Sequence, residues 1–208
     1  HCTLWAARNP APGMDYDPGT WRRRHAVEVD ACGETRVLEL HSWPGVFAHG
    51  ELDPGTSLLL AALPRPARRA RVLDFACGAG IIGAALAKSE PTIELEALDS
   101  SALACRSARE TFRANGIDGE VFASDGFSEA RGRYDLIVSN PPFHHGHRTD
   151  PSLTPSLLAE AGNFLAPGGQ LVLVANRHLP YARWLRREFT GYECLASDRS
   201  YHVHCARR

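Results

Sequence analysis

The 208-residue sequence has no long apolar run, no Cys-x-x-Cys pair and almost no net charge. Its longest apolar stretches have only the length of a strand, so we expect no membrane-spanning helix. The first residues lack the basic and apolar regions of a signal peptide, and no initiator methionine is present. We therefore expect a cytoplasmic protein that is either processed or a fragment of a longer chain.

The cysteines and histidines lack the sequence spacing of a metal site. The six cysteines are scattered, which also argues against a disulfide framework, and we interpret them as free thiols in a reducing cytoplasm. His144, His145 and His147 form a small cluster without further ligands at a suitable spacing, so we interpret them as solvated loop residues. The sequence therefore predicts no bound metal.

The charges nearly cancel, but the arginines are grouped. A net charge of −1 and a pI of about 6.9 do not indicate a nucleic-acid binder by bulk charge. Local basic patches can still contact phosphates, whereas solvated helix faces explain most such runs. The groups are Arg22–Arg24, then Arg65, Arg68, Arg69 and Arg71, then Arg183, Arg186 and Arg187, and finally Arg207 and Arg208.

Residues 1–42 are predicted to form an N-terminal arm followed by a β-hairpin. Roughly the first 20 residues are rich in Pro, Gly and Asp and show no hydrophobic periodicity. Two alternating segments follow, near Arg24–Val29 and Arg36–Leu40, and Cys32-Gly33-Glu34 between them indicates the turn of a hairpin.

Residues 43–208 are predicted to form one α/β domain. Asp53 and Pro54 suit the N-cap and first position of a helix that extends to Leu63. From Arg71 onward, strands and helices alternate, which indicates a mainly parallel sheet with a C-terminal antiparallel hairpin. The expected strands are Val72–Ala76, Ile93–Leu98, Glu120–Phe122, Tyr134–Val138, Gln170–Val174, Glu193–Ala196 and Tyr201–Cys205, and the expected helices are Gly80–Lys88, Ala102–Asn115, Ser152–Phe164 and Tyr181–Phe189.

Three glycines follow the first of these strands in the pattern Gly-x-Gly-x-x-Gly. They are Gly78, Gly80 and Gly83, and Asp99 ends the next strand 21 residues after Gly78. This spacing fits a dinucleotide site, in which the acid contacts a ribose hydroxyl. Asp74 argues against that ligand, because a carboxylate beside the loop would repel a pyrophosphate. S-adenosylmethionine carries a sulfonium and an ammonium, so it suits an acidic loop better, and Asp99 keeps its ribose role.

An acid also ends the third strand of this run, in Ser124-Asp125-Gly126. One interpretation is that Asp125 accepts a hydrogen bond from an adenine amino group. The other is that Asp125 is a turn residue or a helix cap, and the sequence leaves both open.

The tetrapeptide Asn140-Pro141-Pro142-Phe143 directly follows an apolar strand and carries the most chemical information. The Asn140 side-chain oxygen and the Pro141 carbonyl can accept both hydrogens of one planar amino group, and Phe143 can stack on the ring that bears it. The simpler interpretation is a proline-stiffened turn. All of these candidates follow strand ends, where an open α/β sheet binds its ligands, so we expect them to line one crevice.

Taken together, the chain resembles class I S-adenosylmethionine-dependent methyltransferases, which have a Rossmann-like fold around a mainly parallel, seven-stranded sheet. Over residues 43–205 it is similar to the catalytic half of the bacterial ribosomal RNA guanine-N2 methyltransferases of the RsmC type. The segments that carry the resemblance are Pro44–Phe47, Asp53–Leu60, Cys77–Gly80, Ala114–Gly116, Val121–Ser124, Ser139–His144 and Val174–Asn176.

This resemblance implies methylation of a guanine N2 in 16S ribosomal RNA, at nucleotide 1207, with the assembled small ribosomal subunit as substrate. It implies that Phe47 and Thr56 close the methionine end of the cofactor. It also implies an N-terminal, degenerate methyltransferase-like domain, for which this chain has no room. The remaining cofactor-binding residues that we expect are Asp74, Ala76, Gly78, Gly80, Asp99, Ser100, Asp125, Gly126 and Asn140, with Asn140, Pro141 and Phe143 as the catalytic set.

Two positions depart from the family pattern, and three other functions compete. Ala76 stands where the family usually has glycine, and Asp125 stands where close relatives carry asparagine. One competitor is methylation of another planar group, a protein glutamine or an adenine N6, although such relatives more often carry tyrosine at the place of Phe143. The others are an NAD-dependent oxidoreductase, which Asp74 and Asn140 disfavour, and a non-catalytic RNA-binding relic of the fold.

Overall fold

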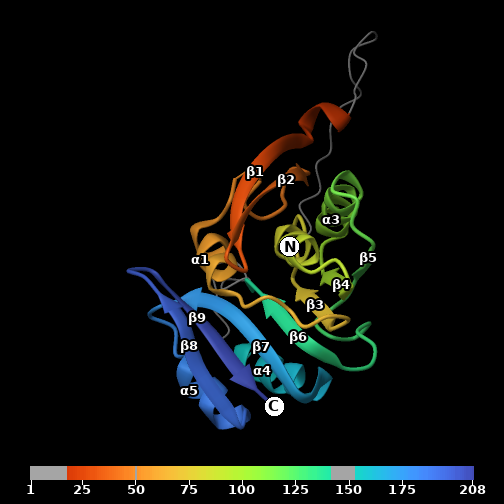
Figure 1. Ribbon diagram of the computed structural model, residues 1–208. Helices are drawn as coiled ribbons and strands as arrows, with labels where there is room; N and C mark the ends of the chain where they lie inside the picture. The colour runs from red at the N-terminus through yellow and green to blue at the C-terminus, as the bar shows by residue number, and fades with distance from the viewer. Residues whose placement is uncertain (1–17, 50, 142–152) are drawn as a thin grey trace, which may run out of the picture.

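A mainly parallel sheet forms the centre of the protein in the computed structural model, which describes residues 18–49, 51–141 and 153–208. Within these ranges seven strands pair in the order β5-β4-β3-β6-β7-β9-β8 (Figure 1). The first five in this order are parallel, and β9 is antiparallel to both of its neighbours. The strands are β3 (Arg71–Phe75), β4 (Glu94–Asp99), β5 (Gly119–Ala123), β6 (Tyr134–Ser139), β7 (Leu165–Asn176), β8 (Gly191–Ser197) and β9 (Tyr201–Arg207).

Helices cover both faces of the sheet because side chains in a strand alternate between its faces. Val72 packs into the core shared with α1, α2 and α3, whereas its neighbour Leu73 packs into the core shared with α4 and α5. The helices are α1 (Pro54–Ala62), α2 (Ile81–Ser89), α3 (Ala102–Ala114), α4 (Leu153–Phe164) and α5 (Tyr181–Glu188), and a short 3₁₀ helix, η1 (Pro18–Trp21), precedes the first strand. No helix in the described ranges has the length and apolarity to cross a membrane.

The predicted fold class is confirmed, and most of the boundaries differ from the predicted ones by one or two residues. At α2 and β7, glycine accounts for the difference. α2 begins at Ile81 rather than Gly80, because Gly80 has a φ of +78° and forms the N-cap. β7 begins at Leu165, five residues before the predicted start at Gln170. Its extra residues include Gly168 with a φ of +78°, and the pairing register with β6 shifts there. The strand therefore continues through a β-bulge or similar irregularity, whereas the glycines in the sequence indicate a turn.

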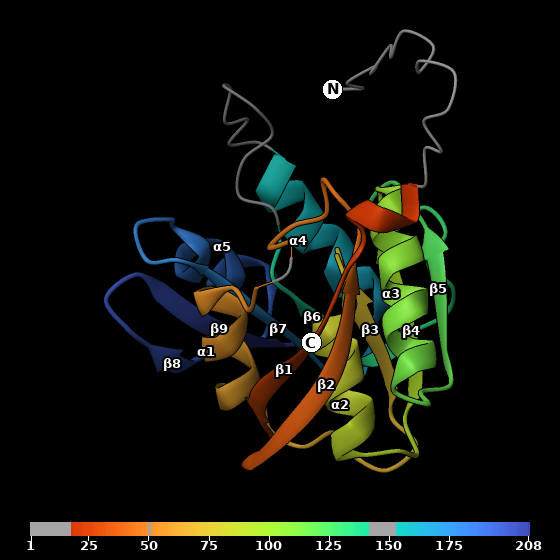
Figure 2. The same ribbon diagram turned by 90° about the horizontal axis from the view of Figure 1, so that it is seen from above.

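The predicted N-terminal hairpin is present as a separate two-stranded sheet of β1 (Arg23–Ala31) and β2 (Glu34–Ser42). Its turn residues Cys32 and Gly33 have φ values of +54° and +78°, the pattern of a tight two-residue hairpin turn. The hairpin lies across α1, α2 and α3 (Figure 2), and its buried side chains belong to the same core as these helices. Those side chains are Val27, Val29, Ala31, Leu38 and Leu40.

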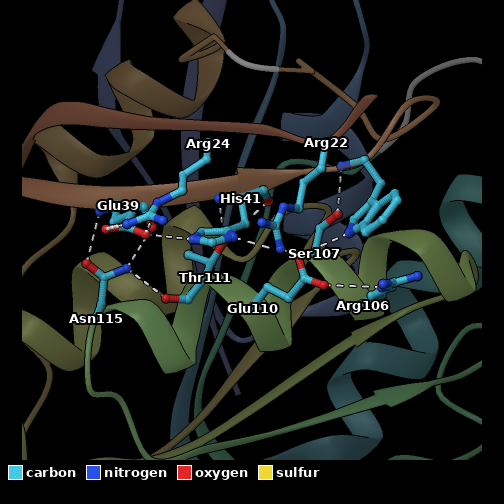
Figure 3. Close-up of polar contacts among 10 residues, drawn as sticks. Arg22, Arg24, Glu39, His41, Arg106, Ser107, Glu110, Thr111 and Asn115 are labelled. Atoms are coloured by element: carbon cyan, nitrogen blue, oxygen red, sulfur yellow. Dashed lines mark hydrogen bonds and ion pairs between the residues drawn. The ribbon is translucent and has the colours of Figure 1, made fainter. Parts of the chain in front are cut away.

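One edge of the hairpin is completed by side chains of α3 rather than by another strand (Figure 3). Residues i and i+2 of a strand are about 6.6 Å apart, and residues i and i+4 of a helix are about 6 Å apart along its axis. Over a short distance, every fourth side chain of a helix can therefore face every second backbone N–H of a strand that runs beside it. Two side chains of α3 and that of its C-cap residue Asn115 accept backbone N–H groups of β2 and of Trp43, which directly follows β2. The bonds run from the backbone N of Trp43 to Ser107 Oγ at 3.2 Å, of His41 to Thr111 Oγ1 at 3.1 Å, and of Glu39 to Asn115 Oδ1 at 3.0 Å.

Glu110 lies on the same side of α3 and joins several groups of the hairpin (Figure 3). Its carboxylate accepts a hydrogen bond from the Trp43 indole at 3.1 Å and pairs with Arg106 at 3.2 Å. Arg22 and His41 approach it at 3.6 and 3.7 Å. Arg106 also lies over the Trp43 ring, 3.9 Å from its centre, so the hairpin is held by polar as well as apolar contacts.

Replacing Thr111 by valine should destabilise the protein by about 1–3 kcal/mol, because the buried N–H of His41 loses its acceptor while the side-chain volume is kept. Chemical unfolding in urea measures this change. The control is Arg113→Ala on the exposed side of α3, which should change the free energy of unfolding by less than about 0.5 kcal/mol. Equal effects of the two substitutions would show that the hydrogen bond contributes nothing.

Glu110 should make the stability of the protein pH-dependent. Burial raises the pKa of its carboxyl, but hydrogen bonds from Trp43 and Arg106 and the positive charges of Arg22 and Arg106 together outweigh burial, so the net pKa is below its usual value. A lowered pKa in the folded state stabilises the protein above the ordinary carboxyl pKa, and this contribution is lost as the pH falls through the folded-state pKa. The difference in Tm between the wild type and Glu110→Gln should therefore be largest near neutral pH and shrink below about pH 4. The control is Glu28→Gln, at an exposed glutamate of β1, which should change the Tm at neutral pH much less than Glu110→Gln does.

Candidate functional site

The candidate residues gather at the carboxyl ends of β3, β4, β5 and β6. β3 pairs in parallel with both β4 and β6, while the chain runs outward to β5 before it returns to β6. In an open α/β sheet, the carboxyl edge at such a reversal is the usual ligand site, and we refer to this edge as the crevice. The arrangement places the four predicted loops next to one another, as the sequence pattern requires.

The glycine loop after β3 is wound by residues with positive φ. Ala76, Gly78 and Gly80 have φ values of +57°, +54° and +78°. Gly78 donates its N–H to Asp99 Oδ2 at 3.0 Å, and the other oxygen of Asp99 accepts from Ser101 N at 2.8 Å. Asp99 is only half-buried. It therefore ties the loop to β4 and still presents acceptor capacity to the crevice.

The glycines of this loop serve different purposes. A Cβ on Gly80 would lie 2.9 Å from the Cβ of Ala108, so glycine permits the close packing of α2 against α3. A Cβ on Gly83 would lie 3.1 Å from Asp74 Oδ2. A Cβ on Gly78 would meet nothing within 4 Å, so glycine there leaves open space at the crevice and supplies the positive φ.

Asp74 is completely buried behind the loop. Its Oδ2 accepts the N–H of Gly83 at 2.8 Å, which fixes the first turn of α2. Its Oδ1 is buried and has no hydrogen-bond partner among the described residues. Burial raises the pKa of Asp74 to about 7; the Gly83 hydrogen bond opposes this rise, and the nearby Asp99 charge adds to it. Direct contact of Asp74 with a ligand remains a prediction, because its side chain is completely buried and one of its oxygens is engaged by Gly83.

The end of β5 is shaped by Ser124 more than by the aspartate beside it. Ser124 Oγ donates to Gly126 O at 2.9 Å and accepts from Glu129 N at 3.1 Å, and Gly126 has a φ of +56°. The Asp125 side chain is exposed, as is Ser100 after β4. Asp125 takes part in this turn through its backbone carbonyl, which accepts the N–H of Ser128 at 3.2 Å. The contact of its side chain with an adenine amino group stays a prediction.

Asn140 is joined to the beginning of α1. Its Nδ2 donates to Asp53 Oδ2 at 2.9 Å and to Thr56 Oγ1 at 2.8 Å. Asp53 also accepts the N–H of Thr56 at 2.9 Å, which confirms its predicted role as the N-cap of α1. Sequence reasoning identified Thr56 only through the family resemblance and missed Asp53 as a site residue. The pattern Asp-x-x-Thr at the start of a helix was the available signal, but nothing in it points to Asn140.

Pro141 follows Asn140 and is buried at the rim of an apolar hollow on the α4 side of the sheet. The adjacent Ser139 donates to Phe75 O at 2.7 Å, so the end of β6 is fixed to the end of β3. Phe143 lies outside the described residues. The hollow is lined by Phe75, Phe127, Ile137, Ser139, Pro141, Leu158, Ala161, Leu171, Leu173 and Tyr181.

Phe47 lies on the connection between β2 and α1 and is 64% exposed. Figure 2 shows this connection passing over the end of the sheet that carries the other loops. The described structure thus joins Gly78 to Asp99 and Thr56 to Asn140, and it leaves Phe47, Ser100 and Asp125 exposed. The roles of all these residues in binding and catalysis stay predictions.

Many of the grouped arginines are engaged by the protein itself. Arg24 pairs with Glu39 at 2.7 Å, Arg65 with Glu34 at 2.5 Å, Arg71 with Glu96 at 2.5 Å and Arg207 with Glu193 at 2.6 Å. These four side chains are therefore partly neutralised as phosphate ligands. The three clustered histidines lie outside the described residues. Within the described ranges, no group of three or more His, Cys, Asp or Glu side chains is arranged to hold a metal ion.

Replacing Ala76 by glycine should stabilise the protein, because a left-handed conformation costs an alanine about 1–2 kcal/mol. The added freedom of glycine in the unfolded chain offsets about 0.4–1 kcal/mol of this gain, so we expect a net increase of up to about 1 kcal/mol. The matched control is Gly78→Ala in the same loop, which should destabilise the protein. Urea unfolding measures both, and changes of the same sign would contradict the assignment of strain to Ala76.

Comparison with known proteins identifies the fold and close relatives. The family model described as Methyltransferase small domain matches residues 37–205. Ribosomal RNA small subunit methyltransferase C of Chromohalobacter salexigens is 44% identical over 209 aligned residues, which cover 99% of this chain and 59% of that protein. The protein of the same name from Pseudomonas aeruginosa is 42% identical over 208 residues, covering 100% of this chain and 61% of the relative. The chain therefore spans about three fifths of the length of these relatives.

Solved structures agree with this assignment of the fold. The T. thermophilus 16S rRNA N2 G1207 methyltransferase (RsmC), in complex with AdoMet and guanosine, matches with a TM-score of 0.79 and 29% identity. The match covers 90% of this chain and 51% of the Thermus chain. A methyltransferase from Pyrococcus furiosus, at 19% identity and a TM-score of 0.61, covers 82% of this chain and 88% of its own and supports the fold alone.

Proposed function

Because the chain belongs to the methyltransferase small domain family, we propose that it transfers a methyl group from S-adenosylmethionine to the exocyclic N2 of a guanine in 16S ribosomal RNA. The observation that carries this proposal is the similarity of the whole chain, at about 40% identity, to proteins named ribosomal RNA small subunit methyltransferase C. The Thermus relative, which holds AdoMet and guanosine, supports nucleotide 1207 as the target.

The crevice fits this cofactor. Asp99 offers carboxylate lone pairs for ribose hydroxyls, and Gly78 leaves open space where another residue would place a Cβ. Asp74 Oδ1 is a buried acceptor beside the loop, and a nearby cation would favour its ionised form. We propose that Phe47 and Thr56 close the methionine end. The remaining contacts in the proposal come from Ala76, Gly80, Ser100, Asp125 and Gly126 along the same edge.

The bound cofactor supplies an electrophilic methyl group. The protein's part is to hold a poor nucleophile in the correct geometry, because the guanine N2 lone pair is delocalised into the ring. In the proposal, Asn140 Oδ1 and the Pro141 carbonyl accept the two N2 hydrogens, which lets the nitrogen pyramidalise and stabilises its developing positive charge. Phe143 stacks on the base, which must be unpaired or flipped out of a helix. No strong base is required before attack.

We further propose that the substrate is the small ribosomal subunit in the cytoplasm and that an additional N-terminal domain shares its recognition. The relatives are longer than this chain, which covers 59–61% of them. In this view residues 1–42 form an arm and hairpin beside a catalytic domain of residues 43–208. The ion pairs of Arg24, Arg65, Arg71 and Arg207 leave fewer free cations for phosphates on the described surface, which is consistent with shared recognition.

The test is methyl transfer to small subunits that lack the modification, followed by mass mapping of the RNA. Asn140→Ala should lower kcat by about 10²–10³-fold, because one preorganised acceptor is lost in the transition state. Calorimetry should show little change in its affinity for S-adenosylhomocysteine. By contrast, Asp99→Ala should weaken that affinity severely.

Near-normal turnover of Asn140→Ala would mean that the tetrapeptide is only a stiff turn. Methylation of adenine N6 or of a protein glutamine instead of guanine would keep the chemistry and overturn the proposed substrate. Thermal stabilisation by NAD and not by S-adenosylhomocysteine would overturn the cofactor.

A further inference from the structure

The orientation of the Asn140 amide is determined by its two partners. Asp53 Oδ2 lies 2.9 Å from Asn140, and a carboxylate can only accept, so the facing group must be the NH2 of the amide. The same NH2 lies 2.8 Å from Thr56 Oγ1. Thr56 accepts there, because its own hydroxyl hydrogen points to Asp53 Oδ2 at 3.3 Å. Both amide hydrogens are therefore used, and the carbonyl oxygen Oδ1 is the atom left for a ligand.

We propose that Asp53 and Thr56 are positioning residues that hold Asn140 with its carbonyl oxygen toward the target amino group. This inference rests on the proposed function and deepens it. Without the pair, the amide could turn by 180° at little cost and present its NH2 instead. An amide held as an acceptor selects an exocyclic NH2 and rejects a carbonyl such as guanine O6, because two facing acceptors would repel each other and lose their hydrogen bonds.

The local backbone is built to keep the Asp53 carboxylate in place. Asp53 has the extended φ and ψ of an N-cap, −61° and 135°, and Pro54 fixes the first helical position. A Cβ on Gly55 would lie 3.0 Å from Asp53 Oδ2 and 3.2 Å from the Tyr201 ring, so glycine leaves room for both. Thr56 is 4% exposed. The carboxylate thus sits in a confined place between the first turn of α1 and the end of β6.

A helix cap alone would explain the bond from Thr56 N to Asp53, so the test must separate capping from positioning. Asp53→Ser keeps a good N-cap residue, but its shorter side chain does not reach Asn140. We expect a Tm close to that of the wild type, an unchanged affinity for S-adenosylhomocysteine and a kcat lower by about 10–100-fold, because the amide is no longer aligned. KM for the small subunit should change little.

A double-mutant cycle decides whether Asp53 acts through Asn140. If it does, adding Asp53→Ser to Asn140→Ala should cause no further loss of kcat, because the group to be positioned is already absent. Additive losses in the cycle would show that Asp53 acts independently of Asn140, and they would overturn the inference.

Charge repulsion gives a readout that does not depend on methyl transfer. Asn140→Asp places a second carboxylate against Asp53 Oδ2 in place of a hydrogen bond, so it should lower the Tm at pH 7. Adding Asp53→Ser removes one of the two facing carboxylates and keeps an N-cap residue for Thr56 N. The double variant Asp53→Ser with Asn140→Asp should therefore have a higher Tm than Asn140→Asp alone.

The two readouts keep this inference apart from the proposed function. Recovery of the Tm without methyl transfer by any variant or by the wild type would support the pairing and refute the function. A wild type that methylates ribosomal RNA, together with a double variant whose Tm is no higher than that of Asn140→Asp, would refute the pairing and leave the function intact.

Discussion

The parallel pairing of β3 with both β4 and β6 is the constraint on which the rest of this structure depends. It brings the carboxyl ends of strands from both halves of the sheet to one edge, although the chain passes through β5 between them. Asp99 and Asn140 are 41 positions apart in the sequence and reach the same crevice only through this pairing. Ser139 strengthens it at the critical point, because its hydroxyl binds the Phe75 carbonyl at 2.7 Å.

The acids around the crevice first bind the protein's own backbone. Asp74 accepts the N–H of Gly83, Asp99 accepts those of Gly78 and Ser101, and Asp53 accepts that of Thr56. Each carboxylate therefore fixes a loop or a helix start. Only the acceptor lone pairs that these backbone hydrogen bonds do not use are left for a ligand. The burial of the three differs, from complete for Asp74 to partial for Asp53 and Asp99. Burial raises the pKa of Asp74 to about 7.

The hairpin of β1 and β2 belongs to the same core, although it forms its own sheet. α3 accepts its outward N–H groups, which removes an open edge that could pair with another chain. From this anchored hairpin the chain passes over the sheet to Asp53, and from there to Asn140 through the hydrogen bond at 2.9 Å. The segment that leads to Asp53, and so to Asn140, thus begins at a hairpin that is anchored in the core.

The sequence by itself determined the alternation of strands and helices, the glycine loop, the hairpin and the strand ends that carry Asp99, Asp125 and Asn140. These follow from periodicity and turn chemistry, which act over a few residues. Tertiary structure alone decided that Asp74 is fully buried, that β7 continues through Gly168, and that the groups of Arg24, Arg65 and Arg207 meet glutamates. It also decided that Asp53 meets Asn140. Contacts between residues 87 positions apart depend on how the elements pack, which no local pattern encodes.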